Sequence, residues 1–139
     1  MIALLALIIV NMYILINTKE PEKLRIVKEK YQIFREHVKD TEFDHLAKCI
    51  IITGHTYLRG TVGYNMFKGS EIGLCLDGEP NEIFHVLLHE LAHCTVDEYT
   101  HTDQYWTNYK KLRDICIRLN IYAQIPNETP FCGMQIQDK

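Results

Sequence analysis

The stretch from about Asn81 to Cys94 constrains the fold more than any other part of the sequence. It has helical spacing, and apolar side chains occupy most of its sides instead of a single stripe. A helix of this kind must be buried, so the rest of the chain has to pack around it. Its polar residues then need partners, because burying an unpaired polar or charged group is costly.

Those polar residues include an HExxH motif, in which His89 and His93 lie four positions apart and Glu90 follows the first histidine. On a helix this spacing separates two side chains by about 40° around the axis and about 6 Å along it. Both imidazoles can therefore bind one metal ion, with Glu90 beside the open coordination position as a general base. His85 lies one turn earlier, too far from His93 to share the ion, and is predicted to be structural.

A catalytic zinc site requires a third protein ligand, and His101 is the preferred candidate. It follows His93 by eight residues, beyond a predicted break in the helix. Asp97, Glu98 and Asp103 remain alternatives. The sequence therefore predicts one Zn²⁺ ion as cofactor, with the two motif histidines and His101 as ligands.

Three short β-rich segments precede this helix and predict a small sheet. Cys49–Thr53 is a β-branched run, and Val62–Phe67 and Glu71–Leu76 flank a hairpin turn at 68–70. We expect a three-stranded, partly antiparallel sheet, with Glu71–Leu76 at its edge. An extended substrate would pair with that edge strand.

Two amphipathic helices complete the predicted domain. Residues 21–40 carry apolar side chains at steps of three and four, and a similar stripe runs from Asp103 to Leu119. Residues 120–139 are rich in loop-forming residues. The fold class is therefore α+β: a minimal domain over residues 19–139 with the HExxH helix, two further helices and the small sheet.

The first eighteen residues contain no charged side chain, and all but a few are aliphatic. We expect residues 1–18 to form an uncleaved N-terminal membrane anchor, with a cleaved signal peptide or a buried core helix as alternatives. Basic residues follow at once, so the positive-inside bias predicts a single-pass protein whose domain is cytoplasmic. They are Lys19, Lys23, Arg25, Lys28 and Lys30.

The five cysteines are odd in number and show no short CxxC spacing. This pattern is typical of a reducing compartment and not of a disulfide framework. Most of these cysteines are expected to be small buried side chains.

The charge pattern limits the partners. The net charge is −3, which argues against direct nucleic-acid binding. Between Lys68 and Lys110 the chain has no Lys or Arg but eight acidic residues. If these surround the site, they favour a basic peptide as substrate. The oligomeric state is not predicted.

The wider sequence around the motif resembles the WLM/SprT-type zinc metallopeptidases, and most closely the small WLM-like metallopeptidases predicted in large DNA viruses. The resemblance covers most of residues 45–138 and rests on the HExxH helix, "HTDQYW" at 101–106 and "FCGMQIQD" at 131–138. It implies a minimal zincin fold, zinc bound by His89, His93 and His101, Glu90 as general base, and peptide-bond hydrolysis. Cellular members act on proteins crosslinked to DNA, but this chain has no basic patch for that role.

The sequence thus predicts a membrane-anchored zinc endopeptidase acting on a protein or peptide substrate. A tyrosine is expected to assist the metal in stabilising the oxyanion, and Tyr64, Tyr99 and Tyr105 are equal candidates. The alternative is a catalytically silent, zinc-stabilised membrane adaptor. The intact Glu90 favours the enzyme, because a structural site requires no base.

Overall fold

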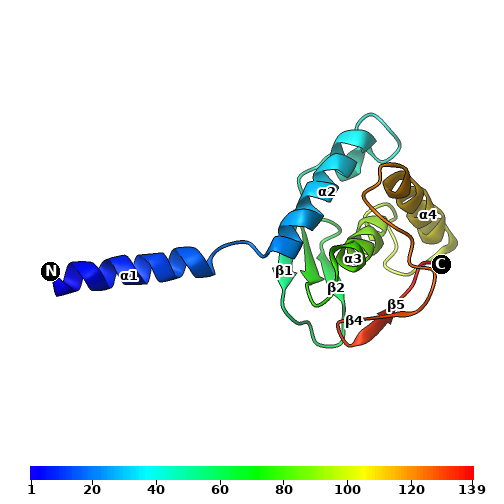
Figure 1. The fold of residues 1–139 in the computed structure, drawn as a ribbon. Helices are drawn as coiled ribbons and strands as arrows, with labels where there is room; N and C mark the ends of the chain where they lie inside the picture. The colour runs from blue at the N-terminus through cyan, green and yellow to red at the C-terminus, as the bar shows by residue number, and fades with distance from the viewer.

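The computed structural model describes all of residues 1–139 and shows an α+β fold. Four α-helices, one 3₁₀ helix and two small sheets make up the chain (Figure 1). In chain order they are α1 (Ile2–Asn17), α2 (Glu22–Val38), η1 (Asp44–Ala47), β1 (Ile51–His55), β2 (Gly63–Met66), β3 (Glu71–Cys75), α3 (Pro80–His93), α4 (Asp103–Arg118), β4 (Thr129–Phe131) and β5 (Met134–Ile136).

The main sheet has three strands in the order β1-β3-β2. β3 runs parallel to β1 and antiparallel to β2, and Tyr64 of β2 lies opposite Gly73 of β3. The predicted mixed sheet and its hairpin are confirmed. The predicted edge position of Glu71–Leu76 is wrong, because β3 is the central strand and β1 and β2 are the edge strands. Sequence periodicity finds strands but does not order them in a sheet.

α3 is the helix around which the domain packs. It contacts α2, α4, β2 and β3, which explains why apolar residues cover most of its sides. Glu79 and Glu82 form a capping box at its N-terminus, where Pro80 begins the first turn. These groups satisfy free backbone N–H groups and place negative charge at the positive end of the helix.

α2 and α4 cover α3 with the apolar faces that their spacing predicts. Every predicted apolar position of α2 is buried, and these are Leu24, Val27, Tyr31, Phe34 and Val38. Thr102 is the N-cap of α4, and its side chain accepts a hydrogen bond from the Tyr105 N–H at 3.2 Å. This N-cap fixes the start of α4 directly after His101.

α1 projects away from the rest of the chain (Figure 1) and has no buried residue. With 16 residues, neither it nor any other single helix meets the length and hydropathy expected of a membrane span. Only α1 and α2 taken together do so, as a pair bent by 51°.

The tail contains a second sheet that the sequence does not predict. β4 and β5 pair antiparallel, and Cys132 in the turn between them forms a disulfide with Cys75 of β3. The expectation that the cysteines are reduced is wrong for this pair, because residues 57 apart in sequence meet at the end of the sheet. Cys49, Cys94 and Cys116 are free.

Candidate metal centre

The structure brings the three predicted histidine ligands together. His89 and His93 lie one turn apart on α3, and their ring centroids are 5.1 Å apart. The ring of His101 lies 4.8 Å from each of them. One nitrogen from each histidine falls within 4.8 Å of the others, so this group can hold a metal ion. The acidic alternatives Asp97 and Glu98 are not part of the group, and neither is Asp103.

The spacing of one pair of these nitrogens fits a tetrahedral ion. Zinc–nitrogen bonds of about 2.0–2.1 Å at a tetrahedral angle place two ligand nitrogens about 3.3 Å apart. The Nε2 atoms of His89 and His101 are 3.1 Å apart. No fourth His, Cys, Asp or Glu joins the group, which leaves a coordination position open. An open position is the arrangement of a catalytic site and not of a closed structural one.

A buried tyrosine, Tyr105, packs against the rings of the three-histidine group. The Tyr105 ring lies 4.6 Å from that of His93 and 4.7 Å from that of His101. Its hydroxyl donates to the backbone carbonyl of His89 at 3.0 Å. Tyr105 is fully buried and joins α4 to α3 through this hydrogen bond. It therefore helps to fix the position of His101, which lies just before α4, relative to the two motif histidines.

Burial keeps the site in the protonation states that metal binding requires. It is the main cause that lowers the pKa of His89 to about 3, and the electrostatic influence of His93 and His101 lowers it further. Burial also lowers the pKa of His93 to about 4. Both imidazoles are therefore neutral near pH 7, which is the ligating form. Burial raises the pKa of Glu90 to about 7, and this residue is only 8% exposed.

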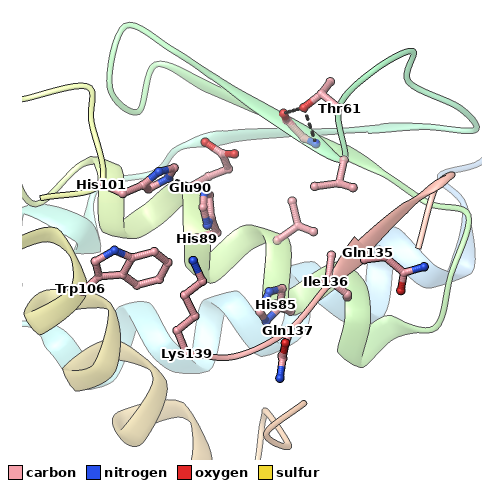
Figure 2. A pocket seen from close by; sticks show the side chains of 13 residues that line it. Thr61, His85, His89, Glu90, His101, Trp106, Gln135, Ile136, Gln137 and Lys139 are labelled. Atoms are coloured by element: carbon pink, nitrogen blue, oxygen red, sulfur yellow. Dashed lines mark hydrogen bonds between the residues drawn. The ribbon is translucent and has the colours of Figure 1, made fainter. Parts of the chain in front are cut away.

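A cavity of about 280 Å³ opens beside His89, Glu90 and His101 (Figure 2). One wall is residues 61–63 at the start of β2, and the opposite wall is β5 with the residues that follow it. Trp106 lines it as well, and its ring stacks on His101 at 5.5 Å. Among Asp, Glu, Lys and Arg, the lining contains only Glu90 and Lys139. The other acidic residues of the 69–109 stretch do not line it.

Two hairpin residues hold the end of α3 and the loop that carries His101. The ammonium of Lys68 donates to the carbonyls of Val96 and Glu98, the latter at 2.7 Å, and lies 3.5 Å from that of His93. Asn65 donates to the Glu90 carbonyl at 3.0 Å. Neither the role of Lys68 nor that of Asn65 is predicted by the sequence. Lys68 has a φ of 48°, and this strain at a turn is a signal that only the structure shows.

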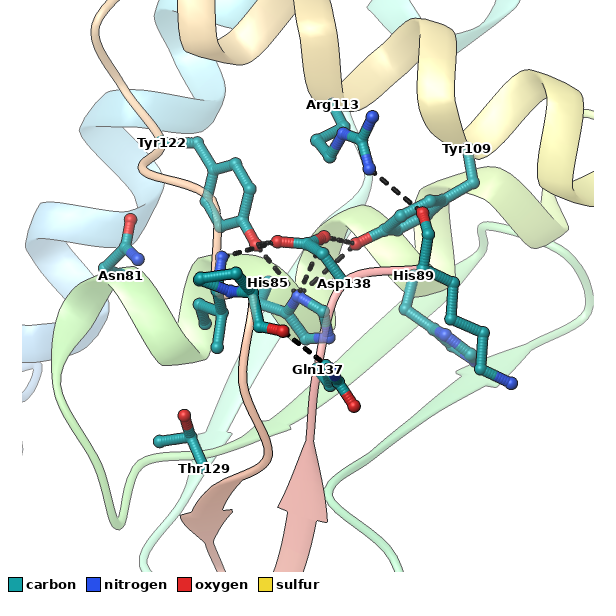
Figure 3. A network of polar contacts seen from close by, with 12 residues as sticks. Asn81, His85, His89, Tyr109, Arg113, Tyr122, Thr129, Gln137 and Asp138 are labelled. Carbon is teal, nitrogen blue, oxygen red and sulfur yellow. Dashed lines mark hydrogen bonds and ion pairs between the residues drawn. The ribbon is translucent and has the colours of Figure 1, made fainter.

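A buried polar network holds the tail against the domain (Figure 3). The Asp138 carboxylate accepts hydrogen bonds from the hydroxyls of Tyr109 and Tyr122 and from the Ile125 N–H. Nδ1 of His85 lies 2.9 Å from the Tyr122 hydroxyl and 3.5 Å from Asp138. His85 is therefore engaged away from the metal group, which agrees with its predicted structural role.

Burial alone would raise the pKa of Asp138. The hydrogen bonds from His85, Tyr109, Tyr122 and the Ile125 N–H outweigh burial and hold that pKa well below its usual range. The network therefore contains an ionised carboxylate at neutral pH.

The structure separates the three tyrosines that the sequence leaves equal. Tyr105 is below the histidines with its hydroxyl on a backbone carbonyl. The hydroxyl of Tyr64 lies 3.2 Å from Glu71 and 3.1 Å from His55, away from the metal group. Tyr99 is 79% exposed and lines a smaller cavity together with Glu90 and other residues of the site. Of the three, only Tyr99 is free to reach a substrate.

Comparisons with known proteins place the chain only loosely. No family model matches it. It is 35% identical over 85 residues to an uncharacterised protein of Acanthamoeba polyphaga mimivirus, a match covering 54% of this chain and 43% of the other. The chain thus spans less than half of that relative. The solved metallopeptidase zymogen abylysin of Pyrococcus abyssi shares 24% identity with a TM-score of 0.43, over 65% of this chain and 95% of that one.

Proposed function

We propose that this chain is a zinc-dependent endopeptidase that α1 attaches to a membrane. One observation carries the proposal: three histidine nitrogens converge on one point, with an open position and the buried carboxyl of Glu90 beside it. A metal-binding triad next to a carboxyl in an accessible cavity is the constellation that activates water for hydrolysis.

Each residue of the site has a role in this reaction. A zinc ion bound there supplies Lewis acidity and a water of lowered pKa. A carboxylate oxygen of Glu90 accepts the proton of the attacking water and later delivers it to the leaving amine. Tyr99 donates a hydrogen bond to the carbonyl oxygen as negative charge develops on it. Two further residues position His101. Tyr105 packs against its ring, and Lys68 holds the loop that precedes it.

The substrate lies along β2. This strand has β3 on one side only, and its first residue, Gly63, lines the cavity together with the two residues before it. The Gly63 carbonyl accepts from the Thr61 hydroxyl at 2.6 Å, so this edge has a local partner in the absence of substrate. An extended peptide replaces that contact with backbone hydrogen bonds and brings its scissile carbonyl to the histidines.

The membrane attachment rests on the composition and exposure of α1. A helix of 16 uncharged, mostly aliphatic residues with none buried is a large apolar surface that water does not favour. Insertion into a bilayer buries that surface, and the basic residues that follow favour a cytoplasmic domain. The Cys75–Cys132 disulfide is more typical of an oxidising compartment. Protease protection in sealed vesicles would show whether the domain lies on the cytoplasmic side of the membrane or on the oxidising side.

The test of the enzyme uses the full chain in detergent. We expect one zinc ion per chain and cleavage of an unstructured protein substrate. Glu90→Gln is expected to abolish cleavage and keep the zinc, whereas Glu128→Gln, in the exposed tail, leaves both unchanged. His101→Ala is expected to lose zinc. Bound zinc without Glu90-dependent cleavage would refute the peptidase and favour the zinc-stabilised adaptor.

A further inference from the structure

β5 and the residues that follow it form one wall of the cavity and supply its only Lys or Arg side chain. Gln135, Ile136, Gln137 and Lys139 all line the cavity, on the side facing β2 (Figure 2). Lys139 supplies the only Lys or Arg side chain in this lining. The amine of Lys139 points toward His89 and Trp106 in Figure 2, and not out along the tail.

The backbone at Lys139 is held on both sides. Its carbonyl accepts a hydrogen bond from Arg113 at 3.0 Å. The preceding residue, Asp138, is buried in the polar network of Figure 3, and its N–H donates to the Ile125 carbonyl at 2.8 Å. Because two anchors fix this backbone, the side chain of Lys139 leaves from a defined point at the cavity wall.

The ammonium of Lys139 has an aromatic neighbour and no anionic one. It lies 5.0 Å from the centre of the Trp106 ring, which itself stacks on the ring of His101. No ion pair in the structure involves Lys139, whereas Lys28, Lys39 and Lys111 each contact a carboxylate. A cation in this position is ready to pair with an anion that enters the cavity.

We infer that Lys139 makes the site selective for a peptide with an acidic side chain next to the scissile bond. This inference rests on the proposed peptidase function. One aromatic ring separates the ammonium from the third histidine, and residues of an extended peptide are about 3.4 Å apart. A side chain that reaches Lys139 while the scissile carbonyl lies at the histidines therefore belongs to a residue flanking that bond. The only carboxyl in the lining, Glu90, is not paired with Lys139.

This selectivity is the opposite of the one that the charge pattern alone suggests. The acidic residues between Lys68 and Lys110 lie outside the lining, apart from Glu90. A basic substrate residue in the cavity would meet the ammonium of Lys139, and the only carboxyl there is that of Glu90, which the proposed reaction uses as the base. An acidic substrate residue would gain an ion pair with the ammonium of Lys139, an exposed residue at the cavity wall, and salt weakens such a pair.

The experiment compares matched peptides on the full zinc-loaded chain. Fluorogenic peptides carry Glu, Gln or Lys at each position flanking a mapped cleavage site, and kcat/KM is measured for wild type, Lys139→Gln and Lys139→Glu. Lys110→Glu is the control, because it makes the same charge change on an exposed residue of α4 with no partner. Zinc content is measured for each variant.

We expect wild type to prefer Glu over Gln by about fivefold at one flanking position, and less at high salt. Lys139→Gln should remove the preference, and Lys139→Glu should shift it to Lys. Lys110→Glu should change neither. A uniform rise in all rates for Lys139→Gln would mean that the side chain only obstructs the cavity, and would overturn the inference, as would an unchanged Glu preference.

A second measurement is independent of turnover. Binding of the Glu and Gln peptides is compared on Glu90→Gln and on the double variant Glu90→Gln/Lys139→Glu by fluorescence anisotropy. Tighter binding of the Glu peptide only where Lys139 is present supports the inference even if no peptide is cleaved. Equal binding refutes it. Failure of the peptidase proposal shows separately, as bound zinc without Glu90-dependent cleavage.

Discussion

Replacing Asp138 by Asn should destabilise the domain strongly at neutral pH and only weakly in acid. The Asp138 carboxylate accepts two tyrosine hydroxyls and the Ile125 N–H, and is buried. An amide of the same shape has no charge, and its NH₂ group faces donors in place of an acceptor. A hydrogen bond to a buried charged group contributes about 1.5–3 kcal/mol, so we expect a loss of about 3 kcal/mol.

The pH dependence follows from the direction of the pKa shift. The pKa of Asp138 is lowered in the folded state, so its ionisation stabilises the fold above the unfolded-state pKa of about 3.9. That contribution is lost as the pH falls through the folded-state pKa. The difference between wild type and Asp138→Asn should therefore be full at pH 7 and shrink steadily below about pH 4.

The assay is urea unfolding of the full chain in detergent, followed by near-UV circular dichroism at a series of pH values. Asp114→Asn is the matched control, since Asp114 lies on the exposed side of α4, and its effect should stay within about 0.5 kcal/mol. A difference for Asp138→Asn that is small at pH 7, or that is the same at pH 7 and pH 3, would refute an ionised, hydrogen-bonded Asp138.

Three further predictions concern the disulfide and the site. Replacing Cys75 and Cys132 together by Ala should cost about 4 kcal/mol of unfolding free energy, from the loop of 57 residues that the disulfide closes, measured with and without reductant. Lys68→Met should weaken zinc binding about tenfold in chelator competition, because the loop before His101 loses its carbonyl contacts. Tyr99→Phe should lower kcat about 100-fold with little change in KM or zinc content.

Each of these has a contradicting result. Equal stability of the oxidised wild type and the double Ala variant would mean that the disulfide does not form in solution. Unchanged zinc affinity in Lys68→Met would mean that the loop holds His101 in place without this lysine. Lys68→Arg is the control and should retain most of the wild-type zinc affinity, because arginine keeps a positive charge that can donate to the same carbonyls. Unchanged kcat in Tyr99→Phe would leave oxyanion stabilisation to other donors.

Much of the fold is encoded locally and was therefore predictable. The buried face of α2 follows from apolar residues at helical steps, and the β2–β3 hairpin follows from two β-rich runs around Lys68-Gly69. The three-histidine group is partly local as well, because His89 and His93 are fixed relative to each other by one helical turn. His101 is brought in by a short loop that ends at the N-cap of α4.

The remaining features depend on contacts between distant segments. The position of β3 between β1 and β2 depends on parallel pairing with β1, which no local pattern encodes. The disulfide joins a residue of β3 to the turn between β4 and β5. The site's dependence on Lys68 involves backbone carbonyls about 30 residues away, and a backbone carbonyl leaves no signature in the amino-acid sequence.

The tail shows how such a distant contact can give a site its specificity. In the sequence, Gln137-Asp138-Lys139 is a polar run in a segment rich in loop-forming residues, and nothing local predicts that it approaches an apolar helix. Burial of Asp138 becomes favourable only because Tyr109 and Tyr122 bring their hydroxyls to one point, where the carboxylate satisfies both. The same contact places Lys139 at the cavity wall. The residue that would set substrate preference is therefore held by a network of which only His85 lines the cavity, and loss of that network should alter selectivity as well as stability.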